Sequence, residues 1–319
     1  MSEPAGDMKP LLSNRTIPRS QLLPTMASPL GYESILSTFD ELVAKKAIFY
    51  APRKTIQFED TGFVLELHIS TSLSKKPQSG EPVSGCEDHQ AEKPECFGPG
   101  SDIGYGDPGL LLATIRDTHL LVVNKFCMFR PQLLLLTCDS YRRQRDPLEL
   151  DDLSAACTVM SDLSARPQFV IYNCGPVAGA SRQHKHLQVL PRPPRLFPDE
   201  RGFESSSVPF RYFLQYLDGV DIGTSDGHEK LFEIYKRLLV EAKQAVGIDP
   251  ESKDHFPHNV ALVKEWIIVI PRQKIDVEGI TANAAGMLGS VWLTSNEQLE
   301  QWKQVGPRKV LAGLGFPNL

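Results

Sequence analysis

Apolar side chains recur at two spacings along the chain, and each spacing predicts one kind of element. Spacing of three and four residues places side chains on one face of a helix, and it occurs in residues 32–46, 147–166 and 229–246. Pro147 opens the second predicted helix, and Gly247 is positioned as the stop signal of the third. Short apolar runs of strand length predict strands at residues 63–69, 110–115, 119–126, 133–137 and 169–172.

The order of these segments predicts an α+β fold. Residues 110–115, 119–126 and 133–137 follow one another at short intervals, as in an antiparallel meander. Antiparallel strands interleaved with a few helices predict an antiparallel sheet core with flanking helices.

Length and composition indicate how the chain is divided. With 319 residues and 41% hydrophobic content, it can bury a sizeable core. Residues 1–28 lack periodicity and predict a disordered leader, so we expect a single domain over residues 29–319. Residues 77–108 are dense in Pro, Gly, Ser and Glu, which predicts a loop insertion within that domain.

Charge and hydropathy exclude several classes of partner. The formal net charge of −5 argues against nucleic-acid binding, which requires a broad basic surface. The longest apolar runs are of strand length and too short to cross a bilayer, so no membrane partner is expected. The N-terminus has no continuous apolar segment of a secretory signal. We therefore expect a cytoplasmic protein, with nuclear access neither supported nor excluded.

The cysteines indicate neither a disulfide framework nor a regular metal site. The six cysteines form no C-x-x-C pair. Cys86, His89 and Cys96 suggest zinc, but their spacing matches no regular zinc module and a fourth ligand is missing. No carboxylate cluster resembles a dedicated metal site, so no metal-ligating residue is predicted.

One segment of the chain concentrates residues that could perform chemistry. His184, His186 and Gln188 alternate, so on a strand they share one face. A loop rich in small residues, 173–180, precedes them and would let backbone N–H groups approach an anion. A neutral imidazole is a good nucleophile toward phosphorus at cellular pH, which favours a phosphoryl ligand. Two surface histidines on an edge strand, or two ligands of an incomplete metal site, are the alternatives.

The same segment resembles a known family. Asn173-Cys174-Gly175, Ala178-Gly179-Ala180-Ser181 and His184-Lys185-His186-Leu187-Gln188 are similar to the signature of ATP adenylyltransferases, also called diadenosine tetraphosphate phosphorylases, of the histidine-triad superfamily. In this branch Gln stands where the nucleotide hydrolases carry a third His. The resemblance implies a histidine-triad-like fold, with His186 as the nucleophile that carries the nucleotidyl group.

Further motifs follow in the order of that family and extend the resemblance over roughly residues 30 to 315. They are Lys75-Lys76-Pro77, the run ending in Asn124-Lys125-Phe126, the hairpin from His258-Asn259 through Lys264-Glu265-Trp266 to Pro271-Arg272, and Asn283-Ala284-Ala285-Gly286.

The resemblance implies reversible phosphorolysis of diadenosine tetraphosphate to ADP and ATP through an adenylyl-histidine. His186 attacks the α-phosphorus and inorganic phosphate accepts the adenylyl group, which predicts ping-pong kinetics. His184 is expected to orient the site through backbone hydrogen bonds, and Gln188 to donate to a non-bridging phosphate oxygen. No covalent cofactor is needed, and a divalent cation such as Mg²⁺ is compatible with the polyphosphate.

Substrate-binding roles are likewise implied by the matched positions. Asn173 and Gly179-Ala180-Ser181-Arg182 would cradle the phosphates, Lys76 and Lys125 would supply charge, and Asn124 would help to fix the nucleotide. Asn283-Ala284-Ala285 would line the second nucleotide end, or would form only a tight turn after a hairpin.

The chain departs from the family pattern at several positions. Gln132 replaces the His of a Pro-x-His motif, and Arg182 stands where Gln is usual. Ser290 and Thr294 replace Met and Lys, so a contact to the far phosphate or base is changed. These departures leave two alternatives open: transfer to another acceptor such as sulfate, and a non-catalytic dinucleoside polyphosphate binder. A plain hydrolase ranks below both, because Gln188 is the wrong residue for it.

Overall fold

The computed structural model describes residues 31–60, 62–75, 97–104, 107–203 and 205–318. The predicted leader, most of the predicted insertion, the candidate zinc ligands and Lys76 lie outside these residues. Its strands are β1 (Phe49–Tyr50), β2 (Lys54–Asp60), β3 (Phe63–Ile69), β4 (Leu111–Ile115), β5 (His119–Val123), β6 (Phe126–Cys127), β7 (Leu133–Thr137), β8 (Gln168–Cys174), β9 (His186–Pro191), β10 (Phe213–Tyr216), β11 (His258–Leu262), β12 (Trp266–Pro271) and β13 (Ser290–Leu293). Its helices are α1 (Tyr32–Ala44), α2 (Leu150–Asp162), α3 (Ser225–Ala245), α4 (Ala284–Met287), α5 (Asn296–Val305) and α6 (Pro307–Leu314).

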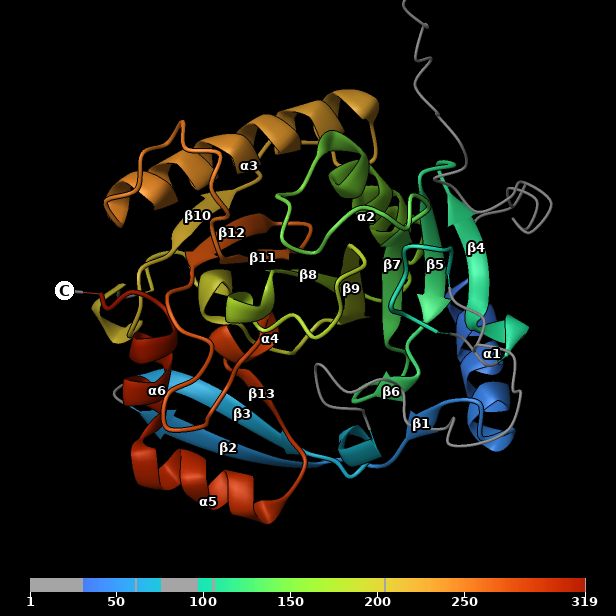
Figure 1. Ribbon diagram of the computed structural model, residues 1–319, viewed down its shortest axis with the longest axis horizontal. Helices are drawn as coiled ribbons and strands as arrows, with labels where there is room; N and C mark the ends of the chain where they lie inside the picture. The colour runs from blue at the N-terminus through green and yellow to red at the C-terminus, as the bar shows by residue number, and fades with distance from the viewer. Residues whose placement is uncertain (1–30, 61, 76–96, 105–106, 204, 319) are drawn as a thin grey trace, which may run out of the picture.

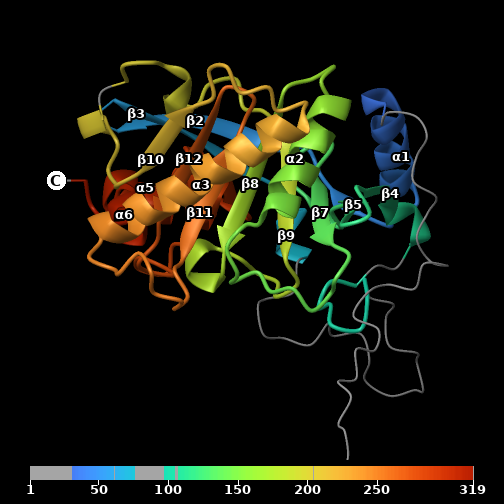
Figure 2. The same cartoon turned by 90° about the horizontal axis from the view of Figure 1, so that it is seen from above.

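An eight-stranded sheet in the order β10-β12-β11-β8-β9-β7-β5-β4 forms the centre of the molecule (Figure 1). Every neighbouring pair in it is antiparallel. Helices α2 and α3 cover one face, and a three-stranded sheet, β13-β3-β2, lies with α4, α5 and α6 on the other side (Figures 1 and 2). The predicted α+β class and antiparallel core are confirmed.

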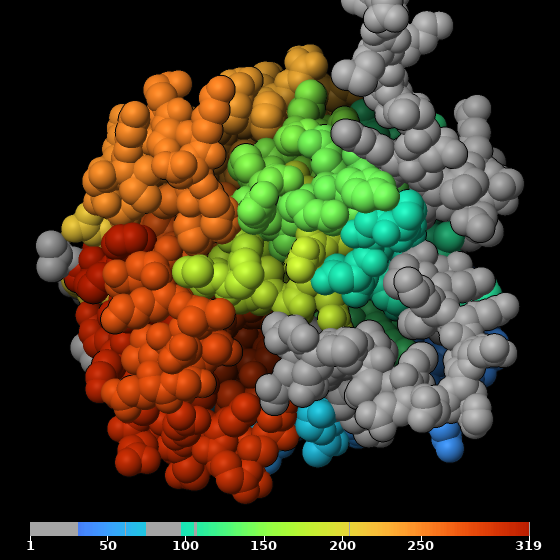
Figure 3. Space-filling view, in the orientation of Figure 1, coloured from blue at the N-terminus to red at the C-terminus, as the bar shows by residue number. Residues whose placement is uncertain are grey.

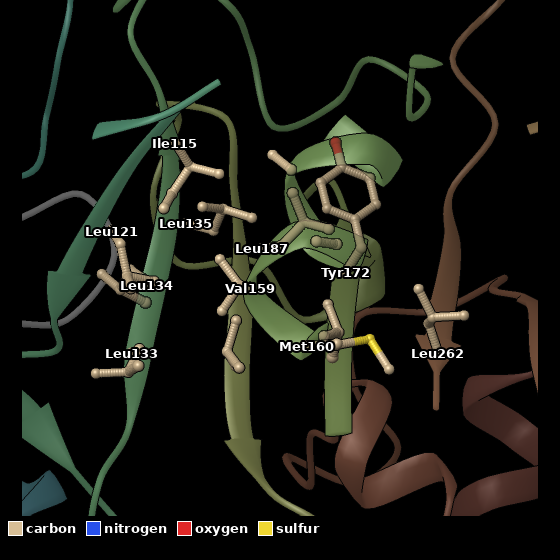
Figure 4. Close-up of a cluster of buried hydrophobic side chains, with 14 of the residues drawn as sticks. Ile115, Leu121, Leu133, Leu134, Leu135, Val159, Met160, Tyr172, Leu187 and Leu262 are labelled. Carbon is tan, nitrogen blue, oxygen red and sulfur yellow. The ribbon is translucent and has the colours of Figure 1, made fainter. Parts of the chain in front are cut away.

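Alternation of side chains along the strands gives the large sheet two apolar faces. On β8, Val170 and Tyr172 join the core under α2 and α3, whereas Phe169 and Ile171 join the core that faces the small sheet. Figure 4 shows part of the first core, in which Tyr172 of β8, Leu187 of β9 and Val159 and Met160 of α2 belong to one apolar cluster. Such two-sided burial explains why the central strands are continuously apolar.

The apolar spacing predicts most of the strands and helices, but some of their first or last residues differ from the prediction. Strands β3 and β7 have the predicted bounds. The predicted strand 119–126 is divided, because β5 ends at Val123 and β6 pairs with β1 in a separate parallel ladder. Helix α3 begins four residues before the prediction, where the Thr224 side chain accepts a hydrogen bond from the Gly227 N–H.

Candidate active site

His186 lies at the start of β9, between β7 and β8, and its side chain is 7% exposed. Its Nδ1 is 2.8 Å from the carbonyl oxygen of His184. A carbonyl oxygen can only accept, so Nδ1 carries the proton and the lone pair of the neutral ring is on Nε2. The backbone thereby selects the tautomer in which Nε2 is the nucleophilic nitrogen.

His184 is fully buried just before β9, where it forms an isolated bridge with Arg143. Its Nε2 donates to the carbonyl oxygen of Thr137 at 2.9 Å, and its Nδ1 accepts from the Ser101 hydroxyl at 2.8 Å. Burial lowers the pKa of His184, which favours the neutral ring. These contacts hold the His184 ring in one orientation, and its role at the site stays a prediction.

Lys185 lies between His184 and His186, points to the opposite face of the chain from them, and is 1% exposed. Its Nζ donates to the Asp152 carboxylate at 2.6 Å and to the Pro147 carbonyl at 2.8 Å. The same carboxylate accepts from His119 Nε2 at 3.0 Å and from the Glu149 N–H at 2.7 Å. This buried network attaches residues 184–186 to the N-terminus of α2.

Gln144 is a site residue that the sequence did not reveal. The ladder between β8 and β9 ends at the pair Ile171 and Gln188. Beyond that pair, the buried Gln144 side chain lies between the two strands and hydrogen-bonds to both. Its Oε1 accepts from the His186 N–H at 2.7 Å. Its Nε2 donates to the carbonyl oxygens of His186 and Asn173, each at 3.0 Å. A side-chain amide thus takes the place of a neighbouring strand.

The described end of the predicted insertion also contacts the site. The Asp102 carboxylate accepts from the N–H groups of Gln183 at 2.7 Å and His184 at 2.9 Å. Together with Ser101, it attaches residues 97–104 to the start of the His184–His186 motif. Neither Asp102 nor Gln144 has a local sequence signal, because each acts through contacts with residues distant in the chain.

The small-residue loop after β8, residues 173–180, packs against residues from the C-terminal part of the chain. Asn173 is buried, and its Oδ1 accepts from Asn259 Nδ2 at 2.9 Å and from the Ala284 N–H at 2.8 Å. Figure 3 shows a hollow beside the yellow-green segment that carries this loop, between it and the orange-red C-terminal part. The structure therefore brings Asn173 together with the start of α4.

Arg272 places a buried positive charge beneath the loop. Its guanidinium is 2% exposed and donates to the carbonyls of Ala178 and Ala282 and to Asn259 Oδ1. Burial lowers the pKa of Arg272 to about 10, so the group remains charged at neutral pH. Among the described residues, no carboxylate forms an ion pair with it. An anion bound by the loop would therefore meet an uncompensated cation.

Gly179 has a positive φ of 91° and lies directly against the start of α4. A Cβ there would be 2.9 Å from both the Ala282 carbonyl oxygen and Asn283 Cα, so we expect Gly179→Ala to displace the loop. The predicted result is a fall in kcat/KM of about 10²-fold, measured in a dinucleotide turnover assay. Gly202→Ala is the matched control, since Gly202 has a φ of 88° and open space around it. Equal losses in the two variants would contradict the close-approach argument.

The other loop residues and the Asn124-Lys125 pair, all predicted to bind substrate, are partly exposed. Ala180, Ser181 and Arg182 are partly exposed on the loop, and Lys125 is partly exposed before β6. Asn124 accepts from the Phe126 N–H at 3.2 Å through Oδ1, which leaves its Nδ2 as the donor end.

The segment from Asn283 to Ala285 forms the start of α4. The Asn283 side chain accepts from the Gly286 N–H and caps α4, while Ala284 and Ala285 are buried. Ser290 is 3% exposed and lies beside a separate cavity of about 480 Å³ between the small sheet and residues 193–197. The Thr294 N–H donates to Gln298 Oε1 at 2.8 Å. No described hydrogen bond joins Ser290 or Thr294 to His186.

In the part of the chain that the structure describes, no group of three or more His, Cys, Asp or Glu side chains is arranged to hold a metal ion. Among the same residues, no helix combines the length and apolar character required to cross a bilayer.

Two family models match consecutive parts of this chain. Residues 33–204 match the Ap4A phosphorylase N-terminal domain, and residues 206–317 match the ATP adenylyltransferase C-terminal domain. Protein APA1 of Saccharomyces cerevisiae is 28% identical over 77% of this chain and 81% of its own length. Diadenosine 5',5'''-P1,P4-tetraphosphate phosphorylase 2 of the same yeast is 25% identical over 88% of this chain and 93% of its own length.

A solved structure of yeast Ap4A phosphorylase Apa2 superimposes with a TM-score of 0.71 at 22% identity, over 92% of this chain and 97% of that one. A second, in complex with Ap4A, gives a TM-score of 0.70 over 92% of this chain and 100% of that one. These structures have the same fold. Since the matched domains together extend over residues 33–317, the chain belongs to the Ap4A phosphorylase and ATP adenylyltransferase family and is a nucleotidyltransferase.

Proposed function

We propose that this enzyme phosphorolyses diadenosine tetraphosphate (Ap4A) to ADP and ATP, reversibly, through an adenylyl group carried on His186. Family membership supports the reaction, since the yeast relative named above is an Ap4A phosphorylase. The observation that supports the covalent route is the hydrogen bond from His186 Nδ1 to the His184 carbonyl, which assigns the lone pair to Nε2. A pure binding protein gains nothing from that arrangement.

The proposed reaction has two displacements at one phosphorus. In the first, His186 Nε2 forms a bond to the α-phosphorus, and the bond from that phosphorus to the bridging oxygen breaks, so ATP leaves. In the second, an oxygen of inorganic phosphate attacks the same phosphorus, the N–P bond breaks, and ADP leaves with His186 neutral again. Division of one displacement into two is the advantage of covalent catalysis.

Binding of the polyphosphate is assigned to groups near the hollow. Asn173, Gly179, Ala180, Ser181 and Arg182 form the loop, and buried Arg272 adds charge beneath it. By family resemblance, Lys76 and Lys125 contribute further charge and the Asn124 Nδ2 donates to the nucleotide. A divalent cation such as Mg²⁺ would accompany the polyphosphate rather than a protein ligand set.

Intact-protein mass spectrometry after brief incubation with Ap4A, without phosphate, tests the covalent step. We expect one adenylyl adduct on the wild-type enzyme, released as ADP when inorganic phosphate is added. Release by sulfate in preference to phosphate would identify a different acceptor. Dinucleotide binding without an adduct, and without turnover when phosphate is restored, would refute the proposal in favour of a non-catalytic binder.

A further inference from the structure

Gln132 and Gln188 form a chain of hydrogen bonds whose direction is fixed at one end by the backbone. Gln132 is 1% exposed, and its Oε1 accepts from the Met128 N–H at 2.7 Å. Its Nε2 donates to Gln188 Oε1 at 3.0 Å. A backbone N–H can only donate, so it must face the oxygen of the Gln132 amide. The nitrogen of that amide must therefore face Gln188.

The direction of the chain determines which end of the Gln188 amide remains for a ligand. Because Gln132 donates to it, Gln188 presents its oxygen to Gln132 and turns its two N–H donors away. Gln188 and His186 alternate on β9 and therefore share a face, so these donors are on the side where His186 presents its ring. A reversed amide would bring a carbonyl oxygen toward phosphate oxygens, and the two would repel each other.

We propose that Gln132 is a positioning residue that orients the Gln188 amide so that its N–H groups donate to the phosphoryl oxygens during transfer to His186. This inference rests on the proposed function, because it needs a phosphorus held at His186. It also explains why the chain tolerates its departure from the family pattern at this position. Histidine, usual there, offers a ring N–H, and glutamine offers an amide N–H, so either can supply the donor that Gln188 requires.

Gln132→Glu is the sharpest test, because it keeps the size of the side chain and the acceptor for the Met128 N–H. An ionised carboxylate cannot donate to Gln188, so the Gln188 amide is expected to reverse. We expect kcat with Ap4A and phosphate to fall by about 10²-fold or more, with KM changed much less, since a donor to developing charge is lost. Adenylyl-enzyme formation in single turnover should slow by the same factor.

The pH profile separates this role from a purely structural one. Once protonated, the introduced carboxyl can donate to Gln188 again while its other oxygen accepts from Met128. The ratio of variant to wild-type kcat should therefore rise as pH falls, whereas simple damage to the fold would leave the ratio flat or lower it. The ratio is used because the pH dependence of any step common to both proteins cancels in it.

Three other variants complete the design. Gln132→His should retain a wild-type-like kcat, because it restores a donor. Gln168→Glu is the matched control: Gln168 is a buried glutamine of the same sheet, its Nε2 donates to the Arg166 carbonyl at 2.7 Å, and it pairs with Pro191 at the far end of β9. It should keep the wild-type kcat. Gln132→Met buries no charge, and its kcat should also fall, because nothing then selects one orientation of Gln188.

The outcomes distinguish this inference from the function on which it depends. If the wild-type enzyme forms no adenylyl adduct from Ap4A, the proposed function fails. If the wild type forms the adduct but Gln132→Met and Gln132→Glu form it at the wild-type rate, only the positioning role is overturned. A loss in Gln168→Glu equal to that in Gln132→Glu would also overturn it, since buried charge alone would then account for the effect.

Discussion

Replacement of His186 by alanine is expected to lower the Ap4A phosphorolysis rate by about 10⁴-fold or more, because the variant lacks the only atom that can carry the adenylyl group in the proposed mechanism. Dinucleotide binding should change much less, since the loop and the buried Arg272 charge remain. Initial rates of ADP formation and equilibrium binding of Ap4A measure the two quantities separately.

His228→Ala is the control for loss of a buried imidazole. His228 is 5% exposed in α3, and its Nε2 contacts the Ile222 carbonyl rather than any residue of β9. We expect this variant to retain activity even if its stability falls. Turnover by His186→Ala within tenfold of the wild type would exclude His186 as the nucleophile.

Replacement of Asp152 by alanine is expected to reduce the free energy of unfolding by about 3–5 kcal/mol, because it leaves Lys185 buried without its counter-charge. His119 and the Glu149 N–H lose their acceptor as well. Urea denaturation, followed at a fixed pH near neutrality, measures the change.

Asp151→Ala is the matched control, since Asp151 is the exposed neighbour in the same helical turn. It should cost less than about 0.5 kcal/mol, as expected of a surface substitution. The double variant Asp152→Ala with Lys185→Met should recover part of the loss, because no charge then remains unpaired. Equal stability of the two single variants would show that the buried network does not stabilise the fold.

The same network predicts how the wild type responds to acid. Burial alone would raise the pKa of Asp152, but hydrogen bonding from His119 and the charge of Lys185 outweigh it and lower the pKa from 3.8 to about 2. A carboxyl with a lower pKa in the folded state stabilises that state above its unfolded pKa. This contribution should therefore be present above pH 4 and be lost as pH falls from about 4 to about 2. The slope of stability against pH in that range should be smaller in Asp152→Ala.

Much of the fold follows from local patterns. Strand β7 has its predicted bounds because a run of leucines is buried on both faces, and α1 and α2 follow from apolar spacing. The pairing of β13 with β3 could not be predicted, since parallel strands so distant in sequence carry no local signal of their partnership. The start of α3 was missed because Ser225-Asp226-Gly227-His228 is polar, and only the Thr224 cap marks it.

The candidate site also contains residues that the sequence predicted and residues that only the tertiary structure identifies. The motif identified His184, His186 and Gln188, and the structure supplies the contacts that set their tautomers and amide direction. Lys185 lies inside that motif, but its buried pairing with α2 is a tertiary contact that no spacing predicts. Gln144 was missed for a related reason, because a lone glutamine in a loop is indistinguishable from an ordinary surface residue.

The large sheet contains strands from both parts of the chain matched by family models, residues 33–204 and 206–317. Within that sheet, one ladder joins the two parts, and in it β8 pairs with β11. All residues of both strands are buried. If the chain were cut in the connection between β9 and β10, each fragment would expose a long, apolar, unpaired strand edge, which is a template for aggregation. The loop after β8 would also lose Asn259 and Arg272 beneath it. The two parts are therefore expected to fold as one unit, and a chain cut at this boundary is expected to aggregate unless both fragments are produced together.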